Sequence, residues 1–203
     1  MHRLAGYAVL ALACFLLTGP GSSAEATTIA TFADPSVGSP PPPIPMFTVD
    51  TTADTVAGLW ESPGMTLATV SGTFFNVLFS LPQLNFDASF DTGPGFAEFR
   101  TSGNDLLLRI DFDSAHLANP LAFGATRFMG LNAVSFSGPV VDDSPGIVPG
   151  TESFIFGFGN QTATPDGYTA TAAFIGSGDL VPEPSTVAMF GLLAIALMRR
   201  HRS

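Results

Sequence analysis

Hydrophobic and polar residues alternate with a period of two along most of the central chain. This alternation is typical of strands that bury one face of a sheet and expose the other. The clearest runs are Leu84–Phe90, Leu106–Asp113, Ser153–Phe158 and Tyr168–Phe174. Weaker strand patterns cover residues 47–51, 66–79, 95–100 and 133–137. The pattern therefore predicts a series of short antiparallel strands.

Turn residues separate these runs at the spacing expected of antiparallel sheets. Clusters of Gly, Pro, Asp and Asn lie at residues 91–95, 102–105, 142–146 and 164–167. One helical turn is predicted at Ser114–Asn119, because Ser114 can cap its start and Pro120 would end it. With 19 phenylalanines to fill an interior, we predict an all-β fold, a single antiparallel β-sandwich or jelly-roll-like domain over residues 27–181.

A proline-rich loop is expected at residues 35–45 of this domain. Pro40–Pro43 and Pro45 fix their backbone in an extended conformation and lack the N–H groups that a sheet interior needs. We therefore expect this stretch to lie outside the sheet.

Residues 1–26 have the organisation of a signal peptide. A short basic start precedes the apolar stretch Leu4–Leu17, predicted to be helical, and small helix-breaking residues follow at Thr18–Ala24. Cleavage at one of two small-residue sites would start the mature chain at Glu25 or Thr27. An uncleaved signal anchor is the alternative, which the Gly-Pro-Gly break disfavours.

The only cysteine of the chain, Cys14, lies inside this segment. A lipoprotein in which Cys14 carries the lipid is a further alternative, but Phe15–Leu17 continue the apolar run beyond it. After cleavage the mature chain has no cysteine. Its stability must then come from packing, without any disulfide.

The C-terminal residues 182–203 combine three features in a fixed order. Pro182, Glu183 and Pro184 come first, the apolar run Val187–Met198 follows, and a basic cluster ends the chain. The 12 apolar positions reach about 18 Å as a helix, a marginal membrane span that Ser185, Thr186 and the arginine stems would extend. The anchoring residues would be Val187, Phe190, Leu192, Leu193, Ile195 and Leu197. The stop-transfer residues would be Arg199, Arg200 and Arg202.

This order of features resembles the PEP-CTERM protein-sorting signal of Gram-negative, exopolysaccharide-producing bacteria. The resemblance implies that an exosortase, a membrane transpeptidase-like enzyme, recognises Pro182–Pro184 and that the tail is removed near this motif. It also implies the inner membrane as a partner before processing. An ordinary single-span C-terminal anchor is the alternative. Since the resemblance covers about a tenth of the chain, it concerns the destination of the protein more than the role of its domain.

The charge of the mature region limits its partners. Residues 27–181 contain three arginines, no lysine and 15 acidic residues, which gives a formal net charge of −12. Such a surface repels nucleic acids and anionic lipid headgroups. We therefore expect no nucleic-acid binding.

The residues needed for most catalytic sites are missing from the mature region. It has one histidine, His116, and no cysteine or lysine, and no Gly-x-Ser-x-Gly, zinc-ligand or phosphate-loop motif. A glycan hydrolase with two carboxylates remains an option, for which Glu61, Glu98 and Glu152 are candidates that spacing alone does not pair. We predict that the protein is not an enzyme and needs no cofactor.

The sequence offers two candidate binding sites, whose alternatives are a solvated acidic surface for the aspartates and a position in the core for Trp60. Asp111 and Asp113 lie on one strand face and could offer oxygen ligands to a calcium ion. Trp60, in the predicted loop Gly58–Pro63, could stack on a sugar ring, as exposed aromatic residues do in carbohydrate-binding modules.

The sequence as a whole predicts an exported protein of structural or interaction type. It would be anchored in the membrane before processing and then reside at the cell surface or in the extracellular matrix. A carbohydrate-binding module that recognises exopolysaccharide is the alternative function, and a glycan hydrolase is a second one.

Overall fold

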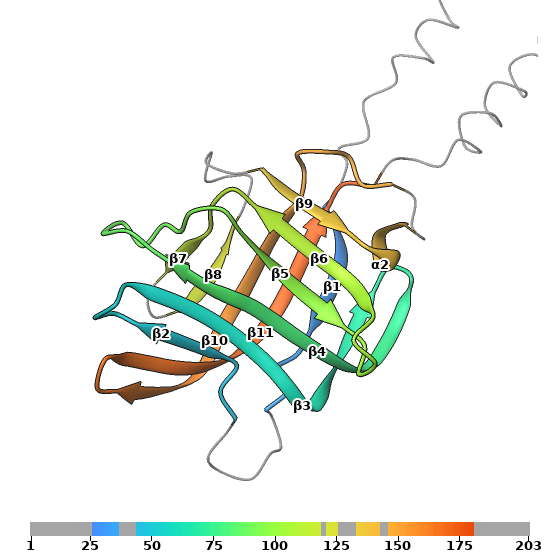
Figure 1. Cartoon of the computed structure of the whole chain (residues 1–203). Coiled ribbons are helices and arrows are strands. Elements are labelled where there is room, and N and C mark those ends of the chain that lie inside the picture. Colours follow the sequence, from blue (N-terminus) through green and yellow to red (C-terminus); the bar gives the residue numbers. More distant parts are fainter. Residues whose placement is uncertain (1–25, 37–43, 119–120, 126–132, 143–145, 181–203) are drawn as a thin grey trace, which may run out of the picture.

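The computed structural model describes residues 26–36, 44–118, 121–125, 133–142 and 146–180, and in these ranges nearly all of the chain is extended (Figure 1). The elements are β1 (Thr27–Phe32), β2 (Phe47–Asp50), β3 (Thr55–Thr69), β4 (Gly72–Asn85), β5 (Gly95–Arg100), β6 (Leu106–Phe112), β7 (His116–Ala118), β8 (Ala122–Ala125), β9 (Val134–Ser137), α2 (Pro139–Asp142), β10 (Ser153–Thr164) and β11 (Gly167–Gly178). The predicted all-β class is confirmed.

Both predicted end segments, the signal-peptide helix and the C-terminal membrane helix, lie outside the described residues. The same holds for most of the proline-rich loop, residues 37–43. In the part of the chain that the structure describes, no helix has the length and apolar character needed to cross a membrane.

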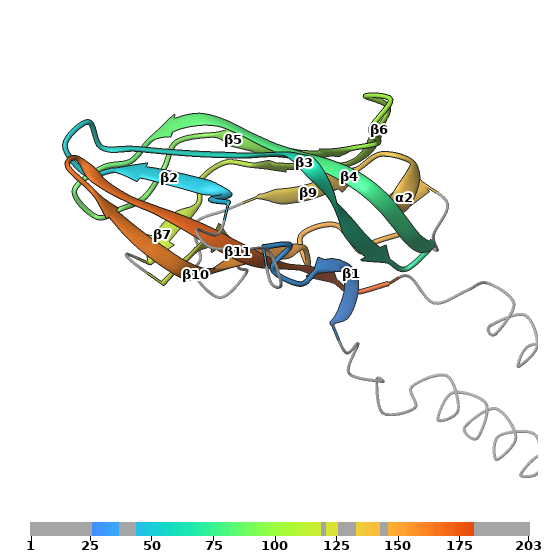
Figure 2. The same cartoon turned by 90° about the horizontal axis from the view of Figure 1, so that it is seen from below.

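All eleven described strands belong to one antiparallel sheet that folds over into two layers (Figure 2). Hydrogen-bonded neighbours run in the order β7-β8-β10-β11-β1-β3-β4-β5-β6-β9. The strands β3, β4, β5, β6 and β9 form one layer, and β7, β8, β10 and β11 form the other. Because β1 and β2 each pair with both β11 and β3, they join the two layers. The sandwich is therefore made from one continuous sheet.

The long hairpin of β3 and β4 bends, so that one part of β3 pairs with β2 and the other part pairs with β1. Its register jumps from Trp60 opposite Phe79 to Met65 opposite Val77, and beyond this bend Thr69 pairs with Ala30 of β1. The two strands come very close at the bend, where a Cβ on Gly64 would overlap the backbone of Asn76. Only glycine allows that approach.

Phenylalanine rings from both layers meet in the core. The ring of Phe99 on β5 lies 5.1 Å from that of Phe174 on β11, and the ring of Phe79 on β4 lies 5.2 Å from that of Phe156 on β10, measured between ring centres. These four side chains are at most 2 % exposed. Burial of such large apolar side chains, together with their tilted contacts, supplies most of the driving force for folding.

The period-two pattern predicts the inward face correctly on three strands. Ile110 and Phe112 of β6, Phe154 and Phe156 of β10, and Phe174 of β11 are all buried, as predicted. The weaker patterns at residues 47–51, 95–100 and 133–137 also correspond to strands, namely β2, β5 and β9.

The prediction of a strand over Leu84–Phe90 is wrong beyond Asn85, where β4 ends. The carboxylate Oδ1 of Asp87 accepts hydrogen bonds from the backbone N–H groups of Ser89 (2.8 Å) and Asp91 (3.1 Å). This side chain closes a turn and overrides the alternation.

The predicted helical turn at Ser114–Asn119 is also wrong, because β7 is extended there. The backbone N–H of Leu117 donates to the carbonyl oxygen of Phe90 at 2.8 Å, and Thr92 pairs with Ala115. These partners are more than 20 residues away in the sequence, so the local capping signals could not reveal them.

Two further differences concern the number of elements. Residues 66–79 form the two arms of a hairpin that turns at Val70 and Ser71, not one strand. The strands β1 and β8 and the short helix α2, which packs against β6 and β9, were not expected. All three are short segments without a strong periodic pattern.

The buried phenylalanines should carry the stability of the domain. Replacing Phe156 by Ala should lower the free energy of unfolding by about 3–5 kcal/mol, because it removes a large side chain and leaves a cavity between the layers. Phe75 of β4 is 71 % exposed, so Phe75→Ala is a matched control that should change stability by less than about 0.5 kcal/mol. Urea unfolding of residues 27–181, followed by Trp60 fluorescence, measures both. Equal effects of the two substitutions would contradict the assignment of the core.

Candidate functional site

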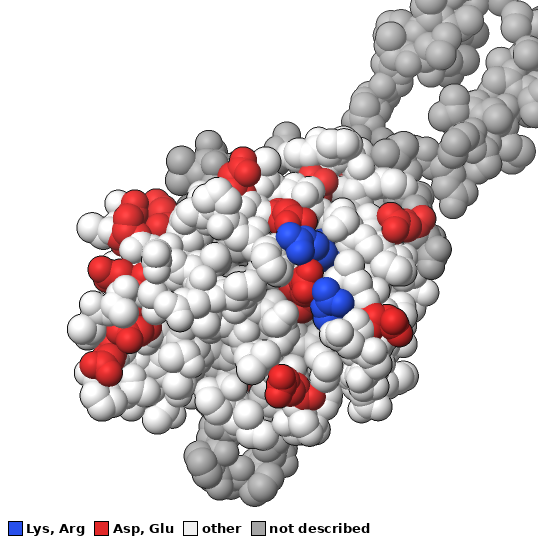
Figure 3. Space-filling view, viewed as in Figure 1, with Lys and Arg blue, Asp and Glu red and all other residues white. Residues whose placement is uncertain are grey.

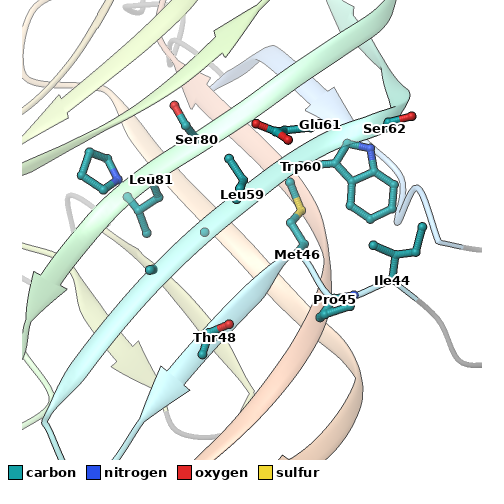
Figure 4. Close-up of a pocket in the computed structure, with 13 residues that line it drawn as sticks. Ile44, Pro45, Met46, Thr48, Leu59, Trp60, Glu61, Ser62, Ser80 and Leu81 are labelled. Atoms are coloured by element: carbon teal, nitrogen blue, oxygen red, sulfur yellow. The ribbon is translucent and has the colours of Figure 1, made fainter.

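An open and mostly apolar groove of about 660 Å³ lies along β2, β3 and β4 (Figure 4). Leu59 of β3 is 55 % exposed and Ile44 is 42 % exposed, and both line this groove. Pairing of Leu59 with Ser80, and of Thr48 with Ala57, brings the three strands side by side. The groove is thus built on a rigid part of the sheet.

Trp60 borders the groove but does not present its ring to solvent. The indole is only 2 % exposed, and its Nε1–H donates a hydrogen bond to the carbonyl oxygen of Pro63. The reason is that Trp60 lies within strand β3 instead of in a loop, and its neighbours Leu59 and Glu61 take the outward positions. An exposed stacking surface at Trp60, as expected from the sequence, is therefore absent.

The groove offers little acid–base chemistry. Glu61 is the one charged residue among those that line it. Of the other candidate glutamates, Glu98 binds two arginines, and Glu152 accepts a hydrogen bond from the backbone N–H of Gly150 at 2.7 Å. Hydrolysis by paired carboxylates needs two acidic groups facing one another across a sugar, and the groove residues supply one.

A charged cluster covers the outer face of β5 and β6 (Figure 3). Arg100 and Arg109 each approach Glu98 to 2.9 Å, and Arg109 also approaches Asp111 to 2.7 Å. The guanidinium of Arg109 lies 3.9 Å from the ring centre of Phe96. Hydrogen bonding to Asp111, and then to Glu98, raises the pKa of Arg109. The members of this cluster satisfy one another, and such exposed pairs contribute about 0–1 kcal/mol each.

Asp111 and Asp113 do not form a cation site with a third acidic residue. Asp111 is already paired with Arg109, and Asp113 follows the end of β6. Among the described residues, no group of three or more His, Cys, Asp or Glu side chains is placed to hold a metal ion. A calcium ion at Asp111 would have to displace the arginine and recruit further oxygen ligands.

His116 ties the two layers together at one edge of the sandwich. Its Nδ1 lies 2.8 Å from Oδ1 of Asp91, and the two residues also form a backbone bridge. Because Asp91 precedes β5 in one layer and β7 belongs to the other, this pair links the layers. The geometry agrees with a structural histidine.

Tyr168 carries a buried polar group without a partner. Its side chain is 8 % exposed, and its hydroxyl is the only fully buried side-chain oxygen or nitrogen of the described residues that has no hydrogen bond. The ring packs edge-on against Phe158. Burial raises the pKa of Tyr168 to about 12. A buried hydroxyl without a hydrogen-bond partner lowers the stability of the fold.

Two features of the surface were missed in the sequence although it contained a signal for them. Glu98 and Arg109 are paired residues of neighbouring strands, which the short turn at residues 102–105 already implies. The exposed Phe75 lies in an uncharged stretch from Ser62 to Phe86, unusual in so acidic a chain. Hairpin register could have revealed the Glu98–Arg109 pair and charge spacing the neutral stretch, whereas the exposure of Phe75 depends on an irregularity in the pairing of β3 and β4.

The predicted sorting, anchoring and stop-transfer residues of the tail lie outside the described residues. The structure describes the chain up to Leu180, which forms a backbone bridge with Ile147. The preceding residue, Asp179, accepts a hydrogen bond from the N–H of Val148 at 2.8 Å. The fold is therefore fixed in place up to two residues before Pro182.

Comparison with known proteins gives one result, and it concerns this tail. Residues 180–203 match the family model of the PEP-CTERM protein-sorting motif. No curated protein and no solved structure matches the chain.

The Tyr168 hydroxyl gives a prediction with a defined pH range. Since the pKa is about 12 in the folded state and 10.0 in a free tyrosine, the unfolded state loses its proton first, and stability should fall as the pH rises from 10 to 12. Tyr168→Phe should remove this fall and, at neutral pH, keep or raise stability by about 1 kcal/mol. Urea unfolding of residues 27–181 at several pH values measures this effect. The other tyrosine of the chain, Tyr7, lies outside residues 27–181, so phenolate absorbance of this protein follows Tyr168 alone. A parallel loss of stability in both proteins above pH 10 would contradict the assignment.

Proposed function

Because residues 180–203 of this chain are a PEP-CTERM protein-sorting motif, we propose that the β-sandwich is an exported, non-enzymatic protein of structural or interaction type. The motif implies export, sorting to the cell envelope and processing by an exosortase. In our proposal the tail holds the domain at the outer side of the inner membrane. Cleavage then releases the domain to the cell surface or the extracellular matrix.

The observation that carries this proposal is the position of the last structural contact. Leu180 pairs with Ile147, and Pro182, the first residue of the Pro-Glu-Pro sequence within the motif, comes two positions later. An enzyme that cuts at or after Pro182–Pro184 would therefore remove the tail without breaking a strand. This arrangement suits a signal that is discarded while the folded domain remains.

The side chains of the tail would act by simple physical means. Arg199, Arg200 and Arg202 would remain on the cytoplasmic side, and the run Val187–Met198 would lie in the bilayer. Pro182 and Pro184 lack backbone N–H groups and favour extended conformations, so the motif would enter an enzyme cleft as a strand.

A structural or interaction role is supported by the surface of the domain. The groove on β2, β3 and β4 is apolar with one carboxylate, Glu61, and the charges on β5 and β6 pair with one another. Such surfaces are better suited to binding other molecules than to acid–base catalysis. We do not extend the proposal to sugar recognition, because the ring of Trp60 is buried.

Replacing Glu183 by Ala should leave export intact and stop maturation. The carboxylate of Glu183 is the one charged group of the motif, so its loss should remove the main polar contact to the processing enzyme. Immunoblots of fractionated cells should then show the precursor band in the membrane fraction and no shorter band.

The matched control is Glu61→Ala, which removes the same side chain from the exposed face of β3. It should mature as the natural protein does. If the Glu183→Ala protein reaches its mature size at the normal rate, recognition does not depend on this motif and the proposal fails.

A further inference from the structure

The outer half of the β3–β4 hairpin, residues 66–76, is an uncharged and partly apolar part of the surface, here called the hairpin tip. Phe75 is 71 % exposed and Val70 is 37 % exposed. From Ser62 to Phe86 the chain contains no charged residue, although the mature region carries a net charge of −12. An exposed phenylalanine on such a neutral segment suggests contact with an apolar surface.

The exposure of Phe75 results from the backbone conformation of β4. Pairing changes from Met65 opposite Val77 to Leu67 opposite Phe74, which leaves one extra residue in β4. Asn76 takes a left-handed conformation at this bulge, with φ of 55°. Because Phe74 and Val77 both take inward positions, the bulge turns Phe75 outward.

The hairpin tip lies at the same end of the sandwich as the start of the tail (Figures 1 and 2). The N–H of Val70 donates to the carbonyl oxygen of Ile29 at 3.0 Å, and Thr27, two residues earlier in β1, pairs with Gly178. The turn of the hairpin is therefore only a few residues from the point where the chain leaves the fold.

The linker between this end and the apolar run of the tail is short. Six residues separate Leu180 from Val187, and seven fully extended steps span about 25 Å. If Val187–Met198 lies in a bilayer, the tail-bearing end of the domain stays close to the lipid surface. A weak contact is then enough, because the tether gives it a high effective concentration.

We propose that, while the tail is still attached, the hairpin tip inserts Phe75 and Val70 into the headgroup region of the membrane. This inference rests on the proposed membrane anchoring of the tail. An aromatic ring is favourable at that depth. The acidic residues of the same end, Glu152 and Asp179 on the β10–β11 side and Asp142 at the end of α2, would be repelled by an anionic surface. The neutral hairpin is therefore the part of this end that meets lipid.

The experiment uses residues 27–203, which keep all eleven described strands and the tail and contain no cysteine. Phe75→Cys introduces one thiol at the hairpin tip, and Leu121→Cys introduces one at a site that is 69 % exposed. Leu121 is a matched control because it lies away from the point where β11 ends at Gly178. Its carbonyl oxygen accepts a hydrogen bond from the N–H of Phe158, and Phe158 pairs with Ala172, six residues before Gly178. Each thiol is labelled with an environment-sensitive fluorophore and added to vesicles of phosphatidylethanolamine and phosphatidylglycerol.

The proposal predicts that the label at position 75 shifts to shorter wavelength and brightens several-fold on vesicle binding, and that headgroup-attached quenchers reach it. The label at position 121 should not change. If the protein floats with the vesicles and both labels stay in water, the lipid contact is overturned while tail anchoring stands. If the protein does not float with the vesicles, tail anchoring is wrong and the contact falls with it.

Discussion

Antiparallel pairing between β1 and β11 sets Thr27 opposite Gly178, so the chain enters and leaves the sandwich at neighbouring points of one end. Two further features depend on this closure. β1 can reach Thr69 of β3 only because the long hairpin bends, and that bend completes the joint between the layers. The pairing also fixes the point from which the chain leaves the fold, because Leu180 is held against Ile147 two residues before Pro182.

The interior explains how such a domain is stable without covalent or metal support. Residues 27–181 contain no cysteine, and the described residues hold no cluster of metal ligands. Phenylalanine rings such as Phe79, Phe99 and Phe156 instead cross between the layers. A core that depends only on packing needs no oxidising partner to form.

The sequence predicted those parts of the fold that depend on local pattern. Alternation identified the buried faces of β6, β10 and β11, because each of these strands has one side in the core. It failed where a distant partner or one side chain decides the conformation, as with the turn closed by Asp87 and the extended pairing of His116. Trp60 was misjudged for the same reason, since the prolines and glycines around it mark a bend within a strand and not a loop. The sorting motif needed no tertiary information, because it is a continuous stretch of sequence.

The central claim is that the domain is complete at Leu180 and that the tail is a separable tether. Amide hydrogen exchange in β1 and β11, measured on residues 27–203 and on the same protein after removal of residues 182–203, tests this most directly. The account predicts equal protection of both strands in the two forms, because every described backbone pair lies before Val181. Rapid exchange throughout β11 once the tail is gone would show that the tail is part of the fold and would contradict the account.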